Sequence, residues 1–109
     1  MSSYRDLKPR RLKSWLDHDP GSVFLLDVRQ PFEFDIASVS GSSLIPLGEL
    51  EDRIKAVPTD VRIVCICHHG MRSAHACRIL AAHGHTHLYN LTGGIERWST
   101  EVDPEVPRY

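Results

Sequence analysis

Short apolar runs alternate along this chain with segments of helical periodicity, and this alternation constrains the fold more than any other feature. The apolar runs at 22–28, 62–67 and 86–91 are bounded by turn residues and have the length of buried β-strands. Weak extended character is expected at 39–45. Strands that alternate with helices predict an α/β sandwich with a mostly parallel central sheet.

Proline, glycine and apolar spacing predict the helices between these strands. Pro9 suits the first turn of a helix, and Asp19-Pro20-Gly21 ends that helix. Gly84 is a natural cap at the end of another helix. The segment 102–109 contains two prolines and is expected to be irregular. Further helices are expected at 31–36, 47–57, 73–83 and 95–99.

Length and composition restrict the class of protein. A chain of 109 residues has the size of one ordinary domain, so residues 1–109 are treated as a single domain. The net charge of −1 gives no bulk attraction to nucleic acid or to anionic lipid. No apolar run is long enough to span a membrane, and the polar start is unlike a signal peptide. An odd number of cysteines, three, favours a reduced, cytoplasmic protein.

A polar loop follows the most apolar predicted strand and carries the first candidate for chemistry. The loop begins at Cys67, the residue at the carboxyl end of that strand, where parallel α/β sheets bind ligands. A cysteine reacts as its thiolate, and the loop N–H groups and the following helix N-terminus favour an anion there. Gly70 permits a tightly curled backbone, and Arg72 adds a permanent positive charge. The sequence therefore predicts Cys67 as a nucleophile.

The neighbours of Cys67 have assigned roles as well. His68 and His69 add polarity, and Ser73 is expected to cap the helix and to present a hydroxyl. Cys65 and Cys77 fall on apolar faces of a strand and a helix, so both are expected to be small core residues.

Four short motifs occur in order along the chain and together cover nearly all of it. They are Leu26-Asp27-Val28-Arg29 with Pro31-Phe32-Glu33-Phe34, Gly41 with Ile45-Pro46-Leu47, Cys67-x-x-Gly70-x-Arg72-Ser73, and Gly93-Gly94-Ile95 with Trp98. In these motifs the chain resembles a single-domain rhodanese, a member of the rhodanese-like sulfurtransferase family. The resemblance implies a rhodanese-like three-layer sandwich.

The resemblance also implies a mechanism. The thiolate of Cys67 would attack the sulfane sulfur of a thiosulfate-like donor, and the resulting persulfide would pass to a thiol, cyanide or protein acceptor. Arg72 would orient an anionic donor, and Ser73 would donate a hydrogen bond to it. No metal and no organic cofactor is required. The loop positions that vary in the family, and so are expected to tune substrate choice, are His68, His69 and Met71.

Asp27 and Arg29 are supporting residues in this interpretation. They either shape the electrostatics near the loop or form a structural pair at the end of a strand, and the second role is favoured. The family commonly has Gly-His where this chain has Ala37-Ser38. This departure removes any role of that histidine and leaves the nucleophile unchanged.

The sequence bears on four other functions. A cysteine phosphatase or arsenate reductase has five residues between cysteine and arginine, whereas four separate Cys67 from Arg72. A persulfide carrier with a dedicated protein partner stays open. The histidines near Cys67 and at 83–87 lack the spacing of a zinc site. The basic cluster at 8–13 is more simply a solvated helix face than a nucleic-acid site.

Overall fold

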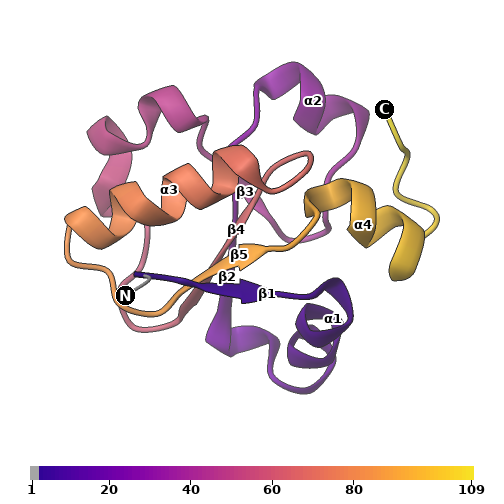
Figure 1. The fold of residues 1–109 in the computed structure, drawn as a ribbon, viewed down its shortest axis with the longest axis horizontal. Helices are drawn as coiled ribbons and strands as arrows, with labels where there is room; N and C mark the ends of the chain where they lie inside the picture. Colours follow the sequence, from indigo (N-terminus) through magenta and orange to yellow (C-terminus); the bar gives the residue numbers. More distant parts are fainter. Residues whose placement is uncertain (1–2) are drawn as a thin grey trace.

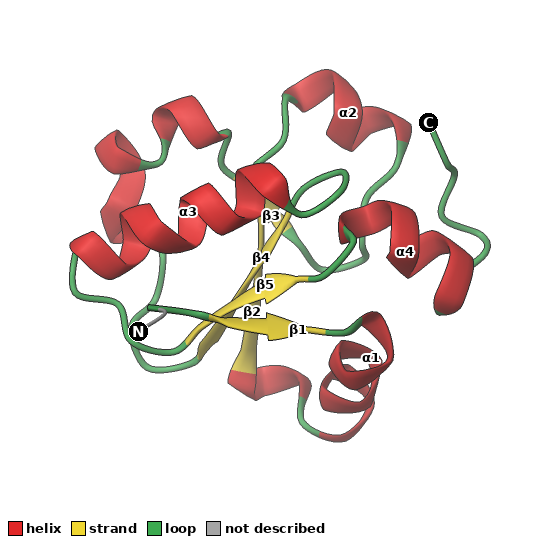
Figure 2. Ribbon diagram, in the orientation of Figure 1, coloured by secondary structure: helices red, strands yellow, loops and turns green. Residues whose placement is uncertain are grey.

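The structure, a computed structural model, describes residues 3–109 as a central sheet with helices on both faces (Figure 1, Figure 2). The strands are β1 (Arg5–Leu7), β2 (Val23–Asp27), β3 (Ser43–Leu44), β4 (Arg62–Ile66) and β5 (Leu88–Leu91). The α-helices are α1 (Pro9–His18), α2 (Pro31–Ile36), α3 (Met71–Ala82) and α4 (Gly94–Glu101). The 3-10 helices are η1 (Pro20–Ser22), η2 (Leu47–Glu49) and η3 (Glu51–Ala56).

The five strands form one sheet in the order β1-β5-β4-β2-β3, and every neighbouring pair is parallel. The predicted α/β class is confirmed, and the mostly parallel sheet is parallel throughout. β4 is the central strand, with β5 on one side and β2 on the other. The chain leaves β4 after Ile66, so Cys67 lies at the carboxyl edge of the sheet, near its middle.

The central strand divides the core into two layers because its side chains alternate between the two faces of the sheet. Ile63 and Cys65 pack with α3 in one buried cluster, and Val64 and Ile66 pack with α1 and α4 in the other. All four side chains are at most 1% exposed. Each large apolar side chain buried in this way contributes about 1.5–3 kcal/mol. The two layers hold the carboxyl end of β4, and therefore Cys67, in a fixed position.

The α-helix expected at 47–57 does not form, and this prediction is wrong. The chain there forms η2 and η3, in which N–H groups bond to the carbonyl three residues earlier, as from Leu50 to Leu47 and from Val57 to Ile54. Arg53 interrupts η3 with a non-helical backbone. Gly48 weakens the α-helical preference, and burial of Leu50 and Val57 is achieved without a regular helix.

The sequence missed β1, which has three residues and lacks an apolar run. Arg5 and Asp6 are exposed, and only Leu7 is buried. The strand exists because its backbone pairs in parallel with β5 at the edge of the sheet. Local sequence patterns contain no signal for such a pairing.

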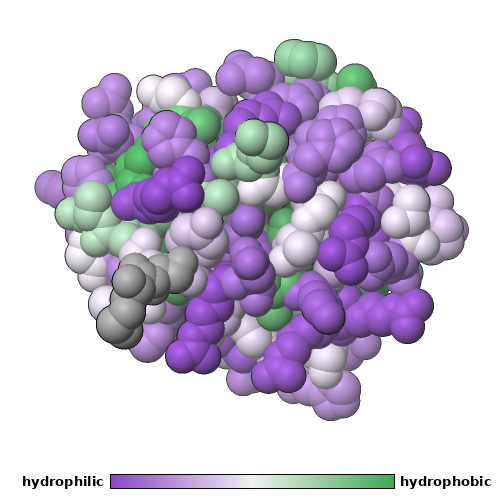
Figure 3. Space-filling model, viewed as in Figure 1, coloured by the Kyte–Doolittle hydropathy of each residue, from purple (hydrophilic) through white to green (hydrophobic). Residues whose placement is uncertain are grey.

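The visible face of the molecule is mainly hydrophilic, with small separate apolar patches (Figure 3). No helix within residues 3–109 combines the length and apolar character needed to cross a membrane. Among residues 3–109, the large apolar side chains that are notably exposed are Phe32, Ile36, Met71 and Tyr109.

Candidate active site

The site is built around the sulfur of Cys67, which is only 1% exposed. The loop between β4 and α3 turns back on this sulfur, and the N–H of Gly70 donates to Sγ at 3.0 Å. Gly70 has φ of +108°, a left-handed conformation that favours glycine. Gly70 therefore allows the tightly curled backbone that the sequence predicted. Its N–H places a partial positive charge next to the sulfur.

Ser73 does not cap α3, which corrects the expected role. The helix begins two residues earlier, at Met71, and Gly70 is its N-cap without a side-chain bond. Ser73 is fully buried, and its Oγ lies 3.2 Å from Cys67 Sγ. Ser73 is not at the capping position because the helix starts at Met71, within the polar segment and not after it.

Asn90 on β5 completes a ring of polar contacts that runs from the Cys67 sulfur through Ser73, Asn90 and Gly70 back to the sulfur. The Ser73 hydroxyl donates to Asn90 Oδ1, and Asn90 Nδ2 donates to the carbonyl of Gly70 at 3.0 Å. A hydroxyl has one proton. While Ser73 donates to Asn90, its oxygen is free to accept from the Cys67 thiol, and turning that proton toward Sγ would stabilise a thiolate.

The N-terminus of α4 holds the backbone of the loop. The N–H of Ile95 donates to the carbonyl of Cys67 at 2.9 Å, and the N–H of Glu96 donates to the carbonyl of His68 at 3.2 Å. Gly94 has φ of +61°, and a methyl group there would collide with both carbonyls. The absence of a side chain at Gly94 thus lets the start of α4 pack directly against the loop backbone.

Arg72 points to a carboxylate rather than to open solvent. Its two Nη atoms form ion-paired hydrogen bonds of 2.6 and 2.8 Å with the carboxylate of Glu33, which α2 supplies. The hydrogen bond from Arg72 lowers the pKa of Glu33 to about 2, against the effect of burial. The same bond raises the pKa of Arg72. An anionic donor at this rim would meet a guanidinium, 37% exposed, that already has a partner.

Asp27 and Arg29 form a fully buried ion pair at the start of the segment between β2 and α2. Arg29 donates to both carboxylate oxygens of Asp27 and to the carbonyl of Ala37. Burial opposes charge on Arg29, but its bonds to Asp27 and Tyr109 raise the pKa above the ordinary value. These contacts shape the segment that carries Glu33, and the supporting role assigned to the pair stays a prediction.

Three rings are stacked along one side of the loop. The ring centroids of His68 and His69 are 4.0 Å apart, and those of His68 and Tyr109 are 3.9 Å apart. Burial, followed by the proximity of His69, lowers the pKa of His68, although Glu96 Oε1 lies 3.6 Å from Nε2. Met71, at the start of α3, is 82% exposed.

The sequence did not identify three side chains that contact the loop residues: Glu33, Asn90 and Tyr109. Glu33 was noted only as part of a motif. Asn90 is a polar residue near the carboxyl end of a predicted strand, and that position was a usable signal. Nothing local pointed to Tyr109, because the tertiary fold alone brings it to the loop.

The other two cysteines lie in the core. Cys65 and Cys77 are fully buried. The pKa of Cys65 is raised by its contact with Cys77 and then by burial, so its thiol stays protonated and shielded from solvent.

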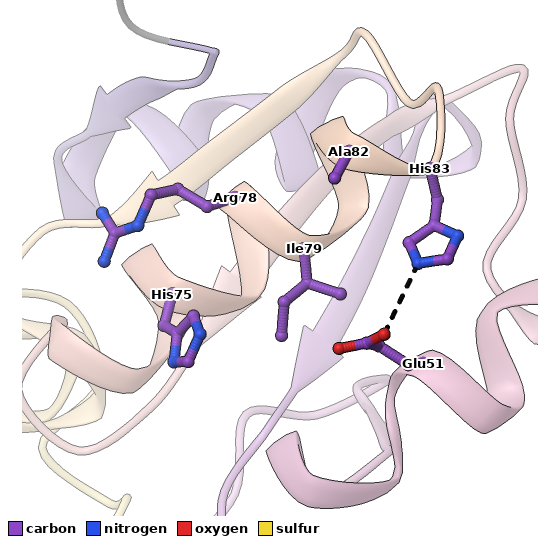
Figure 4. A pocket seen from close by; sticks show the side chains of 6 residues that line it. All are labelled: Glu51, His75, Arg78, Ile79, Ala82 and His83. Atoms are coloured by element: carbon purple, nitrogen blue, oxygen red, sulfur yellow. Dashed lines mark ion pairs between the residues drawn. The ribbon is translucent and has the colours of Figure 1, made fainter.

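A separate groove of about 290 Å³ lies along the outer side of α3, and Cys67 is not among the residues that line it (Figure 4). His83 faces Glu51 across it at 3.9 Å, and His75 lies on the same side of the helix (Figure 4). Within residues 3–109, no group of three or more His, Cys, Asp or Glu side chains is placed to share a metal ion.

Comparison with known proteins identifies a family. The pattern described as "Rhodanese-like domain" matches residues 8–101. The probable adenylyltransferase/sulfurtransferase MoeZ of Mycobacterium tuberculosis is 33% identical over 105 residues, which cover 94% of this chain and 26% of MoeZ. This chain therefore spans about a quarter of that relative's length.

Two further similar proteins match over nearly their whole length. The thiosulfate sulfurtransferase GlpE of Pseudomonas fluorescens is 29% identical, covering 97% of this chain and 94% of GlpE. The crystal structure of a rhodanese-related protein from Thermoplasma volcanium superposes with a TM-score of 0.81 at 33% identity. That match covers 91% of this chain and 94% of the other.

Proposed function

Because the chain belongs to the rhodanese-like family, we propose that it transfers sulfane sulfur from a thiosulfate-like donor to a thiophilic acceptor through a persulfide on Cys67. The observation that carries the proposal is the set of polar groups next to Cys67 Sγ. The sulfur lies at the end of the central strand, accepts from Gly70 N–H at 3.0 Å and contacts Ser73 Oγ at 3.2 Å. The Gly70 N–H suits a thiolate and equally a persulfide anion, and the Ser73 hydroxyl becomes a second donor when its proton turns from Asn90 toward the sulfur.

The proposed reaction has two displacements. The Cys67 thiolate attacks the outer sulfur of thiosulfate, a new S–S bond forms, and sulfite leaves with the electron pair of the broken bond. An acceptor nucleophile, such as cyanide, a thiol or a protein thiolate, then attacks the outer sulfur of the persulfide. The Cys67 thiolate leaves and is regenerated. Neither step needs a metal or an organic cofactor.

The length of the loop favours sulfur over phosphate as the transferred group. Four residues separate Cys67 from Arg72, one fewer than in the loop of a cysteine phosphatase. A phosphoryl group would need a wider loop and several free donors. Assay of a phosphate ester beside thiosulfate tests this choice, and ester hydrolysis without thiocyanate formation would refute it.

A second candidate is a persulfide carrier that serves one protein partner and turns over small molecules slowly. Met71 favours it, because this apolar side chain next to Arg72 is 82% exposed and offers contact area to a protein. Intact-mass detection of one added sulfur atom on Cys67, with weak thiosulfate kinetics, would support the carrier.

We keep a cytoplasmic location as part of the proposal, since all three cysteines are free thiols.

The deciding experiment is thiosulfate:cyanide turnover of the wild type and of Cys67→Ser. We expect Cys67→Ser to abolish thiocyanate formation, because a serine hydroxyl is not ionised at neutral pH and cannot hold the persulfide. Cys65→Ser and Cys77→Ser are the matched controls, and we expect both to retain turnover once circular dichroism shows that they are folded. Full activity of Cys67→Ser would refute the assignment.

A further inference from the structure

Tyr109 lies far from the loop in sequence, yet its side chain contacts three residues at the candidate site: His68, Glu33 and Arg29. Its ring stacks on His68, with centroids 3.9 Å apart and planes 16° from parallel. Its hydroxyl donates to Glu33 Oε2 at 2.8 Å and accepts from Arg29 Nη1 at 2.6 Å. The proposed reaction gives none of these contacts a role.

The fold places this tyrosine firmly. The segment after α4 runs back toward the loop, and the hydroxyl of Ser99 donates to the carbonyl of Val106 at 2.6 Å. Val106 is 8% exposed and belongs to the core layer of α1 and α4. Arg108 then donates to Glu96 at 2.6 Å, directly before Tyr109. Two anchors thus precede the residue that reaches the site.

The carboxylate of Glu33 joins Tyr109 to the rim of the site. Its Oε1 accepts from Arg72, and its Oε2 accepts from both Arg72 and the Tyr109 hydroxyl. A carboxylate held from two directions has one orientation, and a bidentate guanidinium must follow that orientation. Burial raises the pKa of Tyr109, so its hydroxyl keeps the proton it donates.

We propose that Tyr109 is a positioning residue for sulfur transfer: its hydroxyl fixes Glu33, and Glu33 holds the Arg72 guanidinium at the rim of the site, where the anionic donor would bind. The inference rests on the proposed function, since it assigns Arg72 to donor binding. It predicts an effect on the first half-reaction, in which thiosulfate binds, and little effect on transfer to cyanide.

Tyr109→Phe tests the hydroxyl, because the phenyl ring keeps the stack on His68. We expect the KM for thiosulfate to rise about threefold to tenfold, the effect of one lost hydrogen bond, with kcat within about twofold of wild type. Tyr4→Phe is the matched control, since it removes a hydroxyl that accepts from Arg78 at 3.5 Å on the exposed side of α3. A KM for Tyr109→Phe equal to that of Tyr4→Phe would overturn the inference.

A second readout does not depend on sulfur transfer. The rates at which iodoacetate and iodoacetamide alkylate Cys67, followed by peptide mass, compare an anionic with a neutral reagent at one sulfur. We expect Tyr109→Phe to lower the iodoacetate:iodoacetamide rate ratio by about threefold or more, and an unchanged ratio would overturn the inference. If wild-type protein fails to turn over thiosulfate, the proposed function fails, whereas the ratio still tests the role of Tyr109.

The Glu33→Gln variant shows whether the effect passes through the carboxylate. Tyr109→Phe and Glu33→Gln disturb the same contact, so we expect the double variant to have the same alkylation ratio as Glu33→Gln alone. Independent, multiplicative effects of the two substitutions would contradict the proposed route.

Discussion

Gly94 lies against the backbone of the loop that carries Cys67. Its φ of +61° is unfavourable for any side chain, and an added methyl group would meet the carbonyls of Cys67 and His68. We therefore expect Gly94→Ala to lower the free energy of unfolding by about 2–5 kcal/mol through strain and overpacking. Urea denaturation followed by circular dichroism measures this loss.

The control for this substitution is Gly48→Ala in η2. An added methyl group at Gly48 meets nothing within 4 Å, and its φ is not in the left-handed range. Replacing such a glycine changes stability by about 1 kcal/mol or less, often favourably. Equal stability of Gly94→Ala and Gly48→Ala would show that the contact between α4 and the loop is not tight.

Among the elements, α2 and α3 are joined at the site by the ion pair of Glu33 and Arg72. The folded-state pKa of Glu33 is about 2, below its ordinary value of 4.5. A lowered carboxyl pKa contributes stability that is fully present above about pH 4.5 and is lost as the pH falls through about 2. The contact between the two helices should therefore weaken in acid.

Glu33→Gln makes this pH dependence measurable. At pH 7 we expect the variant to be about 1–3 kcal/mol less stable than wild type, because a charge-assisted bidentate pair is lost. The difference should shrink as the pH falls from 4.5 to 2, because Glu33 takes up a proton in the unfolded wild type before it does in the folded state. Stability curves from denaturant titrations at several pH values give the comparison.

The matched control for Glu33→Gln is Glu49→Gln, which removes a carboxylate from a surface ion pair. Glu49 pairs with Arg53 at 3.3 Å, but both side chains are about half exposed, and such surface pairs contribute about 0–1 kcal/mol. We expect almost no change for this variant at pH 7. A pH-independent deficit in Glu33→Gln would contradict the assigned pKa shift.

At the scale of the whole molecule, the sheet order predicts a gradient of local stability. β4 is bonded to a strand on each side and lies between both core layers, whereas β1 and β3 are short edge strands. Amides of β4 should therefore exchange with deuterium most slowly, and those of β1 and β3 fastest, after correction for intrinsic rates. Equal protection in β1 and β4 would contradict this order.

The features that the sequence determined by itself are those that depend only on residues close together along the chain. The apolar runs that became β2, β4 and β5, the polar loop that begins at Cys67 and the core position of Cys65 all follow from neighbouring residues. Periodicity and turn chemistry act over a few residues, so they are readable without the fold. The α/β class and the carboxyl-edge position of Cys67 followed from the same patterns.

Tertiary structure alone decided which distant groups meet at that loop. Glu33 comes to Arg72 from another helix, Asn90 reaches Ser73 from another strand, and Tyr109 arrives from the segment after α4. The same holds for β1, which exists through pairing with β5. Such contacts depend on sheet order and layer packing, and these long-range interactions leave no periodic trace in the residues that make them.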